Sequence, residues 1–148
     1  NMTTKELEQK VVNLLNPIQN PIVPNVSWGL PGLRHECDLL MLDKQHRFTE
    51  IELKISKSDL QADFKKKHGH KCKHISRLVY AVPEALHEFA LKVVPKECGL
   101  IVADDSYYAR WIRVNRHNAN RPTEDVVLKF LKLGAIRIWK SSRVVEKD

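Results

Sequence analysis

Hydrophobic and polar positions recur with two different periods along this chain, and each period predicts a type of element. Apolar residues three or four apart predict an amphipathic helix over residues 4–15, which a Thr3-x-x-Glu6 capping box would open. Over residues 47–55 two sets of side chains alternate, with Glu50, Glu52 and Lys54 in one set and Ile51, Leu53 and Ile55 in the other, which is typical of a strand. Nearly continuous apolar runs at 35–42, 77–82 and 99–103 predict buried strands.

Weaker patterns complete the chain. They predict a short strand within residues 22–28, a helix from Ser56 to near Gly69, a short helix over 84–94, a strand over 109–114, and a helix from Pro122 to about Leu133 with Gly134 as its C-cap. Residues 135–140 fit a strand or a helix.

The resulting order is α-β-β-β-α-β-α-β-β-α, which predicts a mixed α/β fold with helices flanking a central mixed sheet. A chain of 148 residues suits one domain, and we expect residues 1–148 to form it. No apolar run approaches the roughly 20 residues that a membrane helix needs. The N-terminal residues lack the apolar stretch of a signal peptide, and the three cysteines are an odd number, so we expect a cytoplasmic protein with free thiols.

The charge of the chain is the first indication of a partner. The formal net charge is +7, from 25 basic and 18 acidic residues, which favours a polyanion such as DNA but does not distinguish DNA from RNA. The densest basic stretch could contact phosphates or form an ordinary solvated surface. It comprises Lys65, Lys66, Lys67, Lys71, Lys73 and Arg77.

The clearest candidate chemistry lies on the two strands predicted at 35–42 and 47–55. Asp38 interrupts an apolar run, where a carboxylate needs a partner because burying it bare is costly. If the strands pair, Asp38 and Glu52 could hold Mg²⁺, which prefers carboxylate oxygens. Lys54 follows Glu52 on the same face, about 6.6–6.8 Å along the strand, and could hold the attacking water of a phosphodiester hydrolysis.

The same residues also fit two arrangements that need no metal. Glu-x-Lys on a strand is typical of a solvated acid–base ladder, and a salt bridge to Lys54 would satisfy Asp38. Glu50 shares the face of Glu52 and could support the site or bind a second ion.

These motifs resemble the PD-(D/E)XK nuclease superfamily, whose core order is α-β-β-β-α-β. Over roughly residues 33–140 the likeness is closer to its MmcB-like DNA-repair branch. The strings that carry it are residues 50–60 (EIELKISKSDL) followed by Asp63, residues 80–83 (YAVP) and residues 95–104 (PKECGLIVAD). One departure is Cys37, which stands where the superfamily motif has proline.

The resemblance implies a metal-dependent DNA endonuclease with a restriction-endonuclease-like core, acting in DNA repair, with Mg²⁺ as cofactor and Mn²⁺ able to substitute. Asp38, Glu52 and the backbone carbonyl of Leu53 would bind the ion, and Lys54 would be the catalytic lysine. It also implies support from the following helix. Those residues are Ser56, Asp59 and Asp63, for which helix capping and an Asp63–Lys67 ion pair are the alternative.

Two alternatives to a nuclease remain open. Because the superfamily includes members that bind without cutting, the chain could be an inactive DNA-binding module that recruits other DNA-repair proteins. A less favoured interpretation is a small metal-binding domain, with zinc or nickel held by alternating residues in one loop. These are His68, His70, Cys72 and His74, which otherwise belong to a solvated basic loop.

Overall fold

The computed structural model describes residues 1–27, 30–65 and 71–140. Within these ranges, six strands and four α-helices follow one another in the predicted order. Their bounds are α1 (Thr4–Leu15), β1 (Ile22–Val26), β2 (Cys37–Leu42), β3 (Phe48–Leu53), α2 (Lys57–Asp63), β4 (Ile75–Pro83), α3 (His87–Val93), β5 (Gly99–Ala103), β6 (Ala109–Arg113) and α4 (Glu124–Trp139), with a 3₁₀ turn η1 (Glu84–Leu86) before α3.

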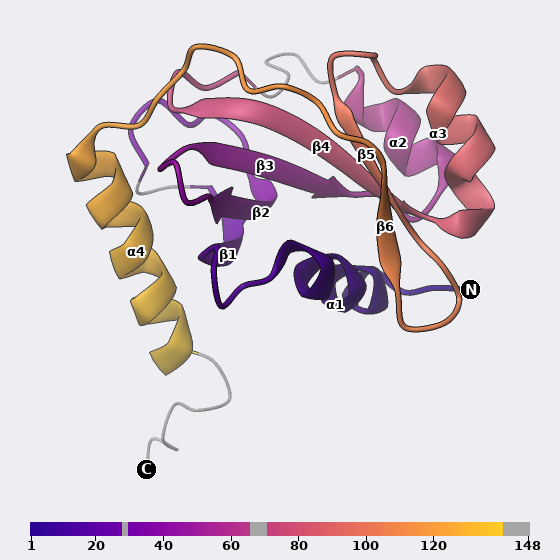
Figure 1. Cartoon of the computed structure of the whole chain (residues 1–148), viewed down its shortest axis with the longest axis horizontal. Helices are drawn as coiled ribbons and strands as arrows, with labels where there is room; N and C mark the ends of the chain where they lie inside the picture. Colours follow the sequence, from indigo (N-terminus) through magenta and orange to yellow (C-terminus); the bar gives the residue numbers. More distant parts are fainter. Residues whose placement is uncertain (28–29, 66–70, 141–148) are drawn as a thin grey trace.

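All six strands join one sheet in the order β1-β2-β3-β4-β5-β6 (Figure 1). β3, β4 and β5 run parallel to one another, and the other neighbouring pairs are antiparallel. The α1-β1-β2-β3-α2-β4 segment has the predicted core order, and the predicted mixed sheet with flanking helices is confirmed. α1 begins with the predicted capping box, in which Thr3 and Glu6 exchange backbone hydrogen bonds.

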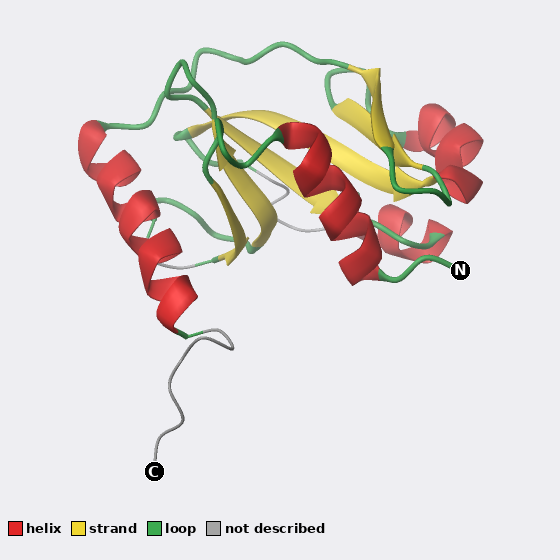
Figure 2. Ribbon diagram, turned by 60° about the horizontal axis from the view of Figure 1, so that its bottom comes forward, coloured by secondary structure: helices red, strands yellow, loops and turns green. Residues whose placement is uncertain are grey.

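The helices divide between the two faces of this sheet (Figure 2). One face is covered by α1, and we call its apolar core the α1 cluster. On the other face α2 and α3 lie together at one end and α4 lies at the other end (Figure 1). The α1 cluster contains Leu7, Val11, Leu15, Leu39, Met41, Ile51, Leu53, Val79, Ala81, Ile101 and Ala103.

Two separate apolar cores lie on the face opposite α1. The α4 cluster contains Val23, Val26, Leu30, Cys37, Leu40, Leu42, Phe48, Cys72, Ile75, Val126 and Phe130. The α2–α3 cluster contains Leu60, Tyr80, Val82, Leu86, Ala90, Val94, Cys98, Leu100 and Val102. The buried glutamates of β3, Glu50 and Glu52, belong to neither cluster, so buried carboxylates lie on this face between the two apolar cores.

Gly134 was predicted to be the C-cap of the last helix, and this prediction is wrong. α4 continues through it to Trp139, so residues 135–139 are helical. A Cβ at Gly134 would lie 3.1 Å from Cγ2 of Val23, so glycine lets α4 approach β1 closely. The helix predicted from Ser56 ends earlier than expected, with α2 stopping at Asp63, whereas residues 66–70 are outside the described part. Among the described residues, no helix has the length and apolar character to cross a membrane.

Candidate functional site

The candidate site is built on β3, whose side chains alternate between the two faces of the sheet. Ile51 and Leu53 enter the α1 cluster, so Glu50 and Glu52 project from the opposite face. Both glutamates are buried, with exposed fractions of 0% and 1%. The predicted alternation is therefore observed, but these acids do not form a solvated ladder, since a solvated face would expose them.

The carboxylates of Asp38 and Glu52 each accept a backbone hydrogen bond across the junction of β2 and β3. The backbone N–H of Asp38 donates to Oε2 of Glu52 at 3.1 Å, and the backbone N–H of Leu53 donates to Oδ2 of Asp38 at 2.8 Å. The regular pairing of β2 with β3 begins at the next pair, Leu39 with Ile51. Each carboxylate thus binds the backbone of the opposite segment, and together they hold the ends of the two strands.

Lys54 lies beside this pair and is held by two acids. Its Nζ is 3.6 Å from Oε1 of Glu52 and 3.2 Å from Oδ1 of Asp63, which is the last residue of α2. The hydroxyl of Tyr80, on β4, donates to Oδ2 of Asp63. Burial raises the pKa of Tyr80, and the Asp63 carboxylate raises it further, so the phenol keeps its proton. Lys54 is therefore positioned by β3, α2 and β4 together.

The donor set at Asp38 and Glu52 suits a hard cation. Two carboxylates from neighbouring strands, with a backbone carbonyl such as that of Leu53, are oxygen ligands of the kind Mg²⁺ prefers. Mg²⁺ usually keeps several waters, so it does not need a cage of protein ligands. The structure thus brings Asp38, Glu52 and Lys54 together, and the residues present fit the ion.

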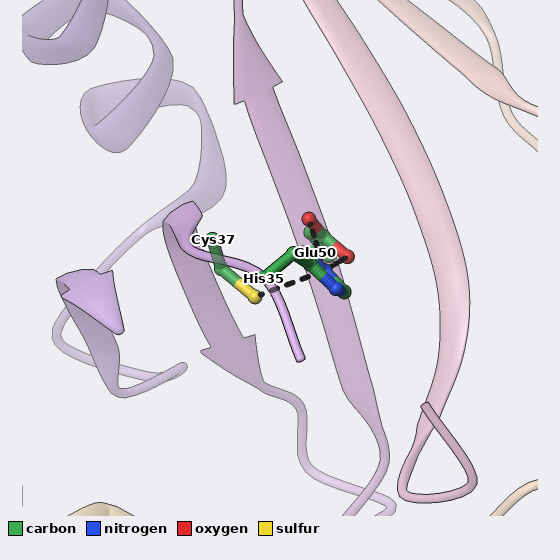
Figure 3. A group of neighbouring side chains, drawn as sticks. All are labelled: His35, Cys37 and Glu50. Carbon is green, nitrogen blue, oxygen red and sulfur yellow. Dashed lines mark hydrogen bonds and ion pairs between the residues drawn. The ribbon is translucent and has the colours of Figure 1, made fainter. Parts of the chain in front are cut away.

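Glu50 does not join that pair. Both of its carboxylate oxygens lie at hydrogen-bond distance from Nε2 of His35, at 2.9 and 3.0 Å. Sγ of Cys37 lies 3.8 Å from the same His35 nitrogen (Figure 3). The sequence interpretation missed His35 and Cys37; the available signal was a His-x-Cys pair just before a strand, with an acid on the next strand.

The residues of α2 divide into capping and packing roles. The Ser56 hydroxyl accepts the N–H of Asp59, and Asp59 is exposed in the first turn of the helix. This hydrogen bond and the exposed acid in the first turn are those of an ordinary helix start. Asp63 is the member that reaches Lys54; its other predicted partner, Lys67, lies outside the described residues.

The predicted basic stretch is distributed over different surroundings. Lys65, Lys71 and Lys73 are exposed, whereas Lys66 and Lys67 are outside the described residues. Arg77 pairs with Thr49 between β4 and β3, donates from Nε to its hydroxyl at 3.0 Å, and stacks over the Trp111 ring. Burial lowers the pKa of the Arg77 side chain.

The alternating loop proposed as a zinc or nickel site is only partly described. Cys72 and His74 are buried, and Cys72 belongs to the α4 cluster. His68 and His70 lie outside the described residues.

Comparison with protein families shows where this chain belongs. The family described as "DNA repair protein MmcB-like" matches residues 2–144, almost the whole chain. The chain is a member of the MmcB-like family. The resemblance found in the sequence motifs is thereby confirmed, and the MmcB-like family connects the chain to DNA repair.

One solved structure supports the fold of this MmcB-like protein, and a second has a lower similarity. SPO1766, a protein of unknown function from Silicibacter pomeroyi, is 24% identical over 99% of both chains, with a TM-score of 0.73. AF1548, also a protein of unknown function, is 11% identical over 97% of this chain and 73% of its own, with a TM-score of 0.42. No curated protein matches the chain.

Proposed function

We propose that this MmcB-like protein is a metal-dependent DNA endonuclease of the PD-(D/E)XK type that acts in DNA repair. One observation supports the proposal: where two neighbouring strands meet, the Glu52 carboxylate accepts the backbone N–H of Asp38, the Asp38 carboxylate accepts that of Leu53, and Lys54 Nζ lies 3.6 Å from Glu52. This arrangement combines ligands for a hard cation with an ammonium group for a phosphate.

The proposed reaction is hydrolysis of a phosphodiester bond. Water adds to phosphorus in line with the leaving ester oxygen, the bond to that oxygen breaks, and the proton lost by water balances the one that the leaving oxygen gains. Asp38, Glu52 and the Leu53 carbonyl would hold Mg²⁺, which supplies positive charge at the phosphate and favours ionisation of the attacking water. Lys54 orients that water and offsets charge on the phosphate.

Asp63 and Tyr80 have a positioning role in this proposal. Asp63 lies 3.2 Å from Lys54 Nζ, and the Tyr80 hydroxyl fixes the other oxygen of that carboxylate. An ammonium group held at this point stays beside Glu52 rather than adopting the many conformations that are open to a free lysine.

The test is a plasmid-nicking assay with Mg²⁺ or Mn²⁺. Asp38→Asn and Glu52→Gln should abolish cleavage, and Lys54→Met should reduce its rate by about 10²–10³-fold, as expected for losing one preorganised charged group. Lys44→Met, at an exposed lysine in the β2–β3 connection, is the matched control and should cut normally. Equal cleavage by wild type, Asp38→Asn and Lys54→Met would disprove the mechanism.

Burial of the site favours a second candidate, a DNA-binding module that recruits other repair proteins without cutting. Glu52 is 1% exposed and the Lys54 side chain 13%, so the chain itself encloses the groups that a nuclease must present to DNA. Such a module would bind DNA through its exposed cations and show no cleavage with either metal.

Salt dependence tests this second candidate. Replacing the exposed Lys71 and Lys73 by glutamine should lower the slope of log affinity against log salt concentration by about 1.8, if each contacts one phosphate. The matched control replaces Lys5 and Lys44, which are also exposed, and should leave the slope unchanged. Cleavage by the wild type would reject this candidate, whereas equal slopes for both double variants would reject the proposed surface.

A further inference from the structure

A second group of ligand atoms lies on the same strand as the candidate nuclease site. Within residues 1–27, 30–65 and 71–140, one set of three metal-ligating side chains has its ligand atoms within 4.8 Å of one another: His35, Cys37 and Glu50. We propose that these three residues bind a zinc ion, or a transition metal of similar preference, at a site separate from Asp38 and Glu52.

The distances fit such an ion. Tetrahedral zinc with ordinary bond lengths places its sulfur, nitrogen and oxygen ligands about 3.4–3.6 Å apart. Sγ of Cys37 lies 3.8 Å from Nε2 of His35, and the Glu50 oxygens lie 2.9 and 3.0 Å from that nitrogen. Zinc binding would bring Sγ slightly closer to Nε2 of His35 and move the Glu50 oxygens about half an ångström away from that nitrogen, and all the ligand atoms already lie within 4.8 Å of one another. Figure 3 shows the three side chains turned toward one another from the segment before β2, from β2 and from β3.

The chemistry of the donors selects the metal. Thiolate and imidazole favour Zn²⁺ over Mg²⁺, and carboxylate is a common third ligand of zinc. Binding would release the thiol proton of Cys37 to solvent, and the proton on Nε2 of His35 would transfer to Nδ1 of the same ring or, if the ring is doubly protonated, to solvent. Two bonds to the ion would then replace the hydrogen bond between His35 and Glu50. Alternate positions of β3 would thus serve different ions, with a mixed donor set at Glu50 and oxygen donors at Glu52 together with Asp38 of β2.

Burial makes this group suited to a bound ion. Glu50 and Cys37 are both 0% exposed, and the side chain of His35 is 8% exposed. Three donors are the usual number at zinc sites that keep one position for water, whereas structural sites usually have four. Because Cys37 precedes Asp38 and Glu50 lies two residues before Glu52, the ion would also fix the two strands that carry the candidate nuclease residues.

The experiment uses the full chain without a histidine tag, stripped of metal by a chelator. Titration with Zn²⁺ should show one ion bound per chain and a rise in Tm, and Co²⁺ should give a thiolate-to-cobalt charge-transfer absorption. Cys37→Ser and Glu50→Gln should each lose stoichiometric binding, and Cys37→Ser should also lose the absorption. Cys98→Ser is the matched control, because Cys98 is a second buried free cysteine in a different cluster, and it should bind like the wild type.

Three results would overturn the proposal: no stoichiometric Zn²⁺ in the wild type, a Co²⁺ complex without the thiolate absorption, or equal binding by Cys37→Ser and Cys98→Ser. If circular dichroism shows that Cys37→Ser is unfolded, Glu50→Gln and the wild-type Co²⁺ spectrum still decide the question. These measurements need no DNA and no cleavage, so the zinc site and the nuclease proposal stand or fall separately.

Discussion

On the α1 face, β3 contributes Ile51 and Leu53 to an apolar cluster beside the neutral Thr49, whereas on the opposite face its buried positions include Glu50 and Glu52. Both pairs are buried to a similar degree. The apolar pair gains stability directly from leaving water. The acidic pair must instead recover its desolvation cost from His35, Asp38 and Lys54.

This difference indicates what each face does. A face that only stabilises the fold has no reason to bury carboxylates, because well-packed apolar residues of similar volume do so at lower cost. Carboxylates retained in a buried zone at some cost to stability are typical of functional sites. The α1 face is therefore the structural half of the sheet, and the opposite face carries the candidate chemistry.

The largest expected effect comes from removing the cation of the acidic face. Lys54→Met should lower the free energy of unfolding by about 3–5 kcal/mol, because it leaves the buried Glu52 and Asp63 carboxylates without their lysine. Urea denaturation measures the change, and Lys44→Met on the surface is the control. An unchanged midpoint would mean that this lysine does not compensate the buried acids.

The second prediction compares neighbouring positions of β3. Ile51→Ala should cost about 2–5 kcal/mol by creating a cavity in the α1 cluster. Glu50→Gln should change stability in metal-free protein by no more than about 1 kcal/mol, because glutamine keeps the shape and still accepts a hydrogen bond from His35. Thermal or urea unfolding of both variants tests this. Equal losses would show that the two faces are equally structural.

The third prediction concerns Tyr80 and its pH dependence. Tyr80→Phe should cost about 1–3 kcal/mol, because Asp63 loses a buried donor. Since burial raises the pKa of Tyr80 in the folded protein, its contribution is complete below the unfolded value of about 10 and is lost as the pH rises through the folded value. The difference in the free energy of unfolding between the wild type and Tyr80→Phe should therefore become smaller in strongly alkaline solution, which urea denaturation at several pH values would measure. A gap that stays constant from neutral to strongly alkaline pH would contradict this prediction.

The smallest expected effect is at Gly134, where α4 crosses β1. Alanine in mid-helix normally adds up to about 1 kcal/mol over glycine. Here its Cβ would lie 3.1 Å from Val23, so Gly134→Ala alone should be close to neutral. When Val23→Ala removes the close contact, Gly134→Ala should increase the free energy of unfolding by most of the value normal for a helix. Urea denaturation of the single and double variants would measure this. If Gly134→Ala alone raised the free energy of unfolding by the full amount of about 1 kcal/mol, Val23 would accommodate the added methyl group without loss of stability.

The accuracy of the sequence-based predictions differs from element to element. The α1 capping box, the alternation of β3 and the buried run of β5 depend on neighbouring residues, and all three were predicted with nearly correct bounds. The predicted end of α4 was wrong: Gly134 is a helix-stop signal locally, but here it lies inside the helix and packs closely against Val23, more than a hundred residues earlier. Local pattern cannot reveal such a contact.

The candidate site shows the same division. The spacing of Asp38, Glu52 and Lys54 predicted that the three would meet, because strand pairing and a period of two settle which side chains share a face. The family resemblance implied a supporting role for Asp63 but not its contact with Lys54, and the sequence indicated neither the part played by Tyr80 nor the meeting of His35 and Cys37 with Glu50.

The sequence by itself determined the order of the elements, the two faces of β3 and membership of the MmcB-like family. Only the tertiary structure decided which acid binds which base, and it assigned Glu50 to His35 and Asp63 to Lys54. The physical reason is that periodicity acts over a few residues. An ion pair between distant residues depends instead on the register of the strands and on where each helix ends against the sheet.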